Sequence, residues 1–126
     1  MITDPNTEMT VILILLFTKH FIVDFPLQTL YMLRKDDKDG WVKPLAAHCG
    51  LHGAATAVLL IPFIGWWAPL LGLMDAVIHF IVDGWKSRKT SYQISDKRFW
   101  TVLGLDQWLH GITCIQIAFL ASGTVS

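Results

Sequence analysis

Four long apolar stretches, separated by short polar segments, make up most of the chain. They run from about 9 to 33, 44 to 61, 67 to 85 and 99 to 121. A hydrocarbon core about 30 Å thick needs about 20 apolar helical residues, so each stretch can cross a bilayer if a few ionisable residues are tolerated inside it. The pattern predicts an all-α fold, an integral membrane four-helix bundle that forms a single domain over residues 1–126.

Proline, glycine and capping residues mark where these helices should bend, begin and end. Gly65 lies in a short turn between the second and third stretches. Pro26 lies inside the first stretch and should kink its helix, which would free the carbonyl of Ile22. Ser95 or Asp96 is expected to cap the fourth helix at its N-terminus.

The basic residues predict how the helices are oriented. Of the ten lysines and arginines, four lie within 34–43 and five within 86–98. The positive-inside rule therefore puts these two segments in the cytoplasm and both termini outside. Tryptophans also gather at the two expected interfaces, as an aromatic belt requires: Trp41, Trp85 and Trp100 near the basic segments, and Trp66 and Trp67 near the opposite boundary.

Composition supports a multi-pass protein of the cytoplasmic (inner) membrane, with the lipid bilayer as its main partner. Hydrophobic residues make up 53 % of the chain, above the ~45–50 % that is usual for a soluble domain. A soluble bundle with very apolar helices is the alternative, and the charge asymmetry disfavours it. Because the net charge is zero, no basic field predicts nucleic-acid binding.

Ionisable residues inside the apolar stretches are the strongest indication of a functional site. All five histidines lie there, together with four of the aspartates. A charged aspartate at the centre of a bilayer costs about 2.5–3.5 kcal/mol, so a metal, ion pairs, water or protonation must offset the cost. The residues are His20, Asp24, His48, His52, Asp75, His79, Asp83, Asp106 and His110.

The spacing of these residues predicts one inward-facing polar stripe on each helix. They form sets four residues apart, which share one face of a helix. Gln28 extends the first stripe and Gln107 flanks the last. Counted from the basic segments, all lie within about 20 Å of the cytoplasmic boundary. The outer half is nearly pure hydrocarbon, so we expect a pocket open to the cytoplasm and no pore.

Histidine with carboxylate and no thiolate suits a divalent transition metal, zinc first, with iron, manganese or nickel as alternatives. Nine groups exceed the four ligands of one tetrahedral zinc, so the sequence allows two ions, or one ion with carboxylates that orient its imidazole ligands. The alternative, mutual His–Asp pairing as structural glue, explains one or two pairs better than nine groups. The expected ligand pool is His20, Asp24, His48, His52, His79, Asp83 and His110, with Asp106 as ligand or base and Asp75 nearby.

Two lysines lie beside the predicted site. Lys86 lies three residues beyond Asp83 and should pair with it, or else bind an anionic substrate or headgroup. Lys19 is adjacent to His20 but lies about 100° round the helix, where it would extend to the interface or pair with a carboxylate. The sequence gives Lys19 no role of its own.

The motifs HxxxDFxLQ from His20, HxxxH from His48, HFxxDxxK from His79 and DQxxH from Asp106 resemble a small bacterial and phage membrane family, a domain of unknown function. The resemblance covers almost the whole chain and implies four membrane helices that share these polar residues. A looser similarity, carried by intramembrane His and Asp, is to membrane proteins labelled as metal-dependent hydrolases.

These observations favour an enzyme, a metal-dependent hydrolase that acts on a lipid or lipid-linked substrate from the cytoplasmic face. A bound metal would acidify a water molecule, and Asp106 or Asp24 would take its proton. The alternatives are a dimetal oxidase, a metal-ion transporter, and a phage or host membrane regulatory module. A homo-oligomer is compatible with each.

Overall fold

The computed structural model describes residues 4–36, 39–89 and 92–122, and all regular structure in these segments is helical. The four long helices are α1 (Pro5–Asp24), α3 (Val42–Ile64), α4 (Ala68–Lys89) and α5 (Lys97–Ala121). A short helix, α2 (Leu30–Leu33), and two 3-10 turns, η1 (Arg34–Asp36) and η2 (Gly65–Trp67), lie between them. The expected all-α architecture is confirmed.

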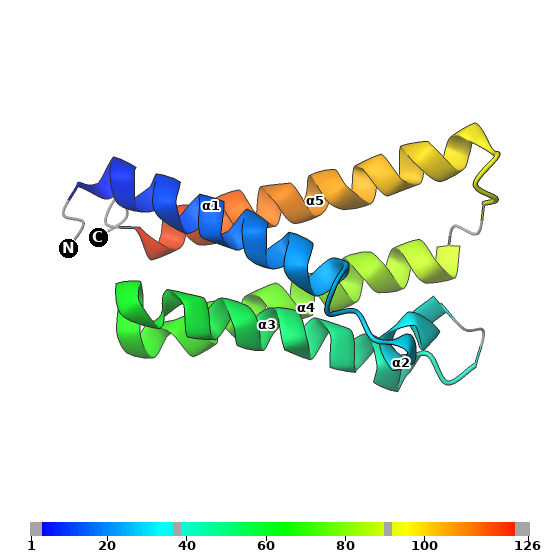
Figure 1. Cartoon of the computed structure of the whole chain (residues 1–126), viewed down its shortest axis with the longest axis horizontal. Coiled ribbons are helices and arrows are strands. Elements are labelled where there is room, and N and C mark those ends of the chain that lie inside the picture. The colour runs from blue at the N-terminus through cyan, green and yellow to red at the C-terminus, as the bar shows by residue number, and fades with distance from the viewer. Residues whose placement is uncertain (1–3, 37–38, 90–91, 123–126) are drawn as a thin grey trace.

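The long helices form two antiparallel pairs (Figure 1). Helices α3 and α4 make a tight hairpin through η2, while α1 and α5 pack beside each other. The start of α1, the turn η2 and the end of α5 lie at one end of the bundle. Helix α2, the end of α4 and the start of α5 lie at the opposite end, which we call the α2 end.

The first predicted stretch bends at Pro26 and divides into two helices. Helix α1 ends at Asp24, because the proline ring has no N–H to continue the helical hydrogen bonds. The carbonyl of Ile22 was expected to be free, and this expectation was wrong, since it accepts a hydrogen bond of 3.0 Å from the N–H of Leu27. Thr29 then caps α2 by accepting from the N–H of Met32.

Of the two residues proposed to cap the fourth long helix, the structure selects Asp96. Its Oδ1 accepts from the N–H of Arg98 at 2.9 Å, and its carboxylate also pairs with the Arg98 guanidinium. Hydrogen bonds from the Arg98 side chain and backbone lower the pKa of Asp96. Gly65 ends α3 with a φ of +57°, a backbone conformation that side chains disfavour.

The backbones of α3 and α4 approach each other closely at two glycines, Gly53 and Gly72. A Cβ atom placed on Gly53 would lie 2.6 Å from the carbonyl oxygen of Gly72. A Cβ on Gly72 would lie 2.5 Å from the carbonyl oxygen of Gly53. This close approach brings the histidines of α3 against the aspartates and histidine of α4.

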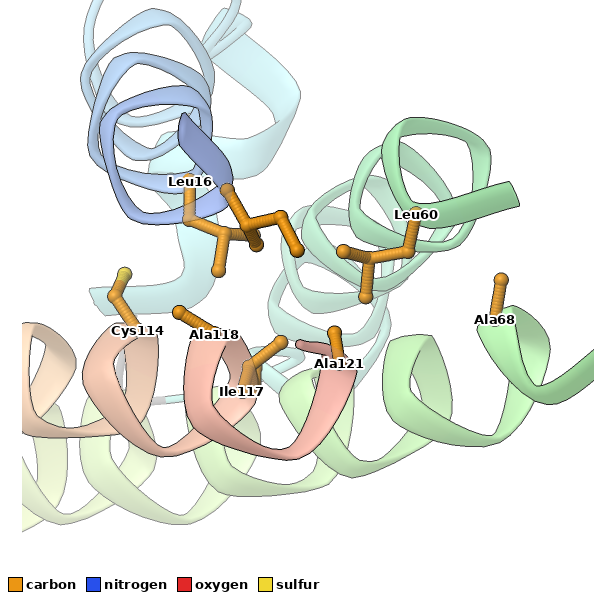
Figure 2. Packing of buried hydrophobic residues seen from close by; sticks show 8 residues of the cluster. Leu16, Leu60, Ala68, Cys114, Ile117, Ala118 and Ala121 are labelled. Carbon is orange, nitrogen blue, oxygen red and sulfur yellow. The ribbon is translucent and has the colours of Figure 1, made fainter. Parts of the chain in front are cut away.

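The interior is divided into an apolar half and a polar half. The apolar half, toward the chain termini, contains small and branched side chains from all four long helices (Figure 2). It consists of Ile12, Leu16, Leu60, Ala68, Cys114, Ile117, Ala118 and Ala121. The polar half lies toward the α2 end, and the buried histidines and aspartates occupy it.

Many large apolar side chains are exposed on the outer surface of the long helices. Among them are Phe21, Val58, Leu73 and Trp108, each 58–68 % accessible. Two stretches are long and apolar enough to cross a membrane, Pro5–Asp24 and Val42–Ser87. The second comprises α3, η2 and most of α4, and is therefore a helical hairpin. By length and composition alone these stretches are weak evidence of a membrane location.

Candidate metal centre

The four long helices bring all five histidines and the four aspartates into one connected cluster. Among them only Asp24 is more than slightly accessible, with a side chain 16 % exposed. Helix α1 contributes its last turn, α3 its first half, α4 its centre and second half, and α5 its centre. The paired spacing in the sequence therefore does produce inward-facing stripes, as expected.

Asp24 is the meeting point of three imidazoles. Its Oδ1 lies 2.7 Å from Nε2 of His52 and 3.2 Å from Nε2 of His48. Its Oδ2 lies 3.0 Å from Nε2 of His20, one turn earlier on α1. Because α1 ends at Asp24, the carboxylate lies at a helix terminus and reaches across to α3.

Asp83 lies between imidazoles of two different helices. Its Oδ1 is 3.0 Å from Nε2 of His110 on α5, and its Oδ2 is 3.5 Å from Nε2 of His48 on α3. Asp106 approaches the same nitrogen of His110 at 3.3 Å. The proton of that nitrogen is directed at Asp83, so Oδ1 of Asp106 is buried with no hydrogen-bond partner.

Three imidazole rings form a stack through the cluster. The ring centroids of His52 and His79 are 3.9 Å apart, and those of His79 and His110 are 4.2 Å apart. His20 lies beside all three, at centroid distances of 5.1–5.7 Å. Rings at this separation would repel one another if all were cationic, and imidazole binds metals in its neutral form.

A buried network behind His79 contains a residue that the sequence did not assign. Nζ of Lys19 donates to Oδ2 of Asp75 at 3.0 Å, and Oγ1 of Thr56 donates to the same oxygen at 2.5 Å. The other oxygen, Oδ1, lies 2.9 Å from Nδ1 of His79. Lys19 is the lone basic residue within the predicted spans, and this was the signal that could have identified it.

This network fixes which ring nitrogens carry protons. An ammonium group can only donate, so Lys19, 3.1 Å away, makes Nδ1 of His52 an acceptor. Nε2 of His52 then carries the proton donated to Asp24, and binding a metal there would release it. Nδ1 of His79 lies 3.0 Å from the backbone carbonyl oxygen of Asp75 and 2.9 Å from its carboxylate Oδ1. Both oxygens can only accept, so Nδ1 carries the proton and the lone pair of His79 Nε2 is free. That nitrogen is buried with no hydrogen-bond partner.

Three groups within the cluster have donor atoms close enough to share an ion. In each group the donor atoms lie within 4.8 Å of one another. A metal would satisfy buried atoms that otherwise have no partner, such as Nε2 of His79 and Oδ1 of Asp106. Asp75 lies behind His79, and a carboxylate in this position typically orients a histidine that binds a metal. The groups are His20, His52 and His79; Asp24, His48 and His52; and Asp83, Asp106 and His110.

The polar residues at the edge of the cluster differ in part from expectation. Lys86 was expected to pair with Asp83, and the structure gives it Asp106 of α5, at 3.5 Å. Gln107 donates to Oδ2 of Asp106 at 3.0 Å, and its Oε1 lies 3.3 Å from Nε2 of His20. Gln28 lies beyond the end of α1, where it donates to the backbone carbonyl of Asp24 and accepts from Lys35. These two hydrogen bonds connect Lys35 to the end of α1 through the Gln28 side chain.

Fold and site together define a small all-helical protein with an apolar exterior and a buried His/Asp centre suited to a metal ion. The chain belongs to the family described as "Protein of unknown function (DUF3307)", whose model matches residues 12–126. The resemblance seen in the motifs is thereby confirmed. Comparisons with curated proteins and with solved structures gave no match.

Proposed function

We propose that the protein spans the cytoplasmic membrane with its four long helices and has both termini on the outer side. The exposed apolar side chains along each helix support this, since in water they would form an unusually large apolar surface. The polar half of the interior lies toward the α2 end, where the described parts of the segments 34–43 and 86–98 carry eight of the ten basic residues. By the positive-inside rule this end faces the cytoplasm.

The cluster binds a divalent transition metal in this proposal, with zinc as the first choice and iron or manganese as alternatives. The observation that carries the proposal is the convergence of three buried His/Asp groups from four helices. Aspartates and histidines left without an ion would have to satisfy one another fully in a dry interior. They do not, because several of their buried atoms have no hydrogen-bond partner.

The reaction that best suits such a centre is hydrolysis of an ester or phosphoester. A divalent ion would acidify a water molecule and polarise the scissile bond. Water then attacks the carbon or phosphorus atom, and the bond to the leaving oxygen breaks. A carboxylate takes one proton from the water and passes it to the leaving oxygen. Of the two candidates, Asp106 is better placed than Asp24, since Oδ1 of Asp106 accepts no hydrogen bond while Asp24 lies within 3.2 Å of three imidazoles.

The position of the centre favours a lipid or lipid-linked substrate. A water-soluble substrate would have to leave bulk solvent to reach donor atoms inside the bundle. An apolar groove of about 710 Å³ along α4 is lined by residues such as Trp67, Met74 and Leu120, and suits an acyl chain. None of the nine cluster residues lines this groove. We therefore propose that it holds the apolar tail of a substrate, while the polar head would have to reach the cluster separately.

Transport is less well supported than hydrolysis. A carrier needs a polar route to both faces of the membrane. In the described part of one chain, Ile12, Leu16 and Leu60 with their neighbours fill the outer half of the interior. Metal flux through the protein would require a rearrangement of this apolar core.

The experiment is a metal count and an activity assay on the same detergent-purified protein. Mass spectrometry should find at least about one transition-metal ion per chain, lost in the His48→Ala/His79→Ala variant and kept in Asp39→Asn, which alters an exposed carboxylate. A panel of lipid esters and phosphoesters then tests turnover. Chelation and His79→Ala should each abolish turnover. Hydrolysis that survives both treatments would refute the proposal.

A further inference from the structure

We infer that the cluster holds two divalent ions bridged by the carboxylate of Asp83. The inference rests on the proposed metal binding and specifies the number of ions and the bridging residue. The group of Asp83, Asp106 and His110 shares no residue with either of the other two groups, which have His52 in common. Of those two, the group of Asp24, His48 and His52 is the one that Asp83 approaches, through His48. Each group offers three donor side chains, the number that catalytic metal sites take from protein.

Asp83 connects the two groups through its two oxygens. Oδ1 faces Nε2 of His110 at 3.0 Å, within its own group, while Oδ2 faces Nε2 of His48 at 3.5 Å, in the other group. A carboxylate has lone pairs on both oxygens and can bind two ions at once. Its central position on α4, between α3 and α5, makes Asp83 the residue through which two ions would share a ligand.

Several separations between donor atoms are close to those found around a metal. Two ligands of a tetrahedral ion with bonds of about 2.0–2.2 Å lie about 3.3–3.6 Å apart. His48 Nε2 lies 3.2 Å from Oδ1 of Asp24 and 3.5 Å from Oδ2 of Asp83, and His110 Nε2 lies 3.3 Å from Oδ1 of Asp106. Two hydrogen-bonded pairs are closer, His52 with Asp24 at 2.7 Å and His110 with Asp83 at 3.0 Å. These two pairs would have to move apart to admit an ion.

The remaining residues have supporting positions in this arrangement. His79 stacks between His52 and His110, one from each group, and one of its ring nitrogens lies within 4.8 Å of ligand atoms of His20 and His52. Oδ1 of Asp106 is the oxygen that could bind an ion, since Oδ2 already accepts from Gln107 and lies 3.5 Å from Nζ of Lys86. Nε2 of His52 gives up its proton on binding.

Two ions also narrow the class of substrate. Three carboxylates and Lys86, 3.5 Å from Asp106, would leave a site with two divalent ions positively charged. An anionic phosphoester would offset this charge better than a neutral carboxylic ester. Two-metal sites elsewhere stabilise both the attacking and the leaving oxygen at phosphorus. The substrate class inferred is a phosphoester joined to an apolar chain.

The test counts the ions and asks whether they are coupled. Detergent-purified protein is stripped with a chelator, reloaded with Mn²⁺, desalted, and measured by mass spectrometry and electron paramagnetic resonance. We expect about two ions per chain and an exchange-coupled spectrum. Asp83→Asn should retain about one ion, with the six-line spectrum of isolated Mn²⁺. Asp39→Asn, at an exposed loop position, should behave as wild type.

Each outcome separates this inference from the proposed function. One isolated ion in the wild-type protein would overturn the two-ion centre and leave metal binding standing, whereas no ion would overturn both. A coupled pair in Asp83→Asn would overturn the bridging role. Should Asp83→Asn fail to fold by circular dichroism, His110→Gln decides, since loss of that ligand should also reduce the count to about one.

Discussion

Oδ1 of Asp75 lies 2.9 Å from Nδ1 of His79, one turn away on α4, while Lys19 of α1 and Thr56 of α3 both donate to the other carboxylate oxygen. Three helices are thus joined behind a single imidazole. Both oxygens of the Asp75 carboxylate therefore have partners. The carboxylate is fixed in place, and it holds the His79 ring in one orientation with its free nitrogen toward the cluster. This arrangement of a carboxylate behind a histidine is typical of metal sites.

Asp75→Asn should weaken metal binding without removing a ligand. The amide keeps the size of the side chain but loses the charge that orients His79 and raises its basicity. We expect affinity to fall by about 10–100-fold, measured by competition with a chromophoric chelator. Asp39→Asn is the control, because that carboxylate is exposed and away from the cluster. Equal affinity in wild type and Asp75→Asn would show that Asp75 has no orienting role.

Lys19→Met should strongly destabilise the fold. The side chains of Lys19 and Asp75 are only 7 % and 3 % exposed, and removal of one partner leaves the other charge buried and unpaired. A loss of about 3–5 kcal/mol in the free energy of unfolding is expected, measured by denaturation in mixed micelles. In Lys19→Met/Asp75→Asn much of this loss should be recovered. Strict additivity of the two single changes would contradict the ion pair.

Gly53→Ala should separate α3 from α4 and reduce metal affinity. Its new methyl group would lie 2.6 Å from the carbonyl oxygen of Gly72 and 2.8 Å from Cβ of Ala76. Overpacking of this kind costs about 1–3 kcal/mol, and the adjacent His52 would move with the backbone.

Gly50→Ala is the matched control on the same helix. A Cβ at Gly50 meets no atom within 4 Å, so alanine should stabilise the helix by up to about 1 kcal/mol. Thermal unfolding in detergent compares the two variants. If Gly53→Ala were as stable as Gly50→Ala, the close contact between the two helices would be refuted.

The cap of α5 should weaken in acid. Hydrogen bonds from Arg98 lower the pKa of Asp96, so its ionised form is favoured in the folded protein. Its contribution to stability is therefore complete above the ordinary carboxyl pKa and is lost as the pH falls through the lowered value. The amide resonance of Arg98 should report this titration by NMR. In Asp96→Asn the acid-dependent change should disappear, and its persistence would assign the titration to another group.

The pattern of the sequence was enough to predict the four long helices and the faces that meet inside them. Apolar length and the four-residue spacing of pairs such as Asp106 and His110 are properties of one helix at a time. They also placed the polar residues toward one end, because distance along a helix follows from residue number. Asp24, His48, His52, Asp83 and His110 all lie in the cluster as expected.

Which side chains face one another was decided only by tertiary packing. The bend at Pro26 ends α1 at Asp24 and lets that carboxylate meet three imidazoles. The contact between Gly53 and Gly72 sets how closely α3 approaches α4. The pairing of Lys19 with Asp75 and of Lys86 with Asp106 depends on the rotation of each helix against its neighbours. Spacing along one helix carries no information about that rotation, since it is fixed by side-chain packing between helices.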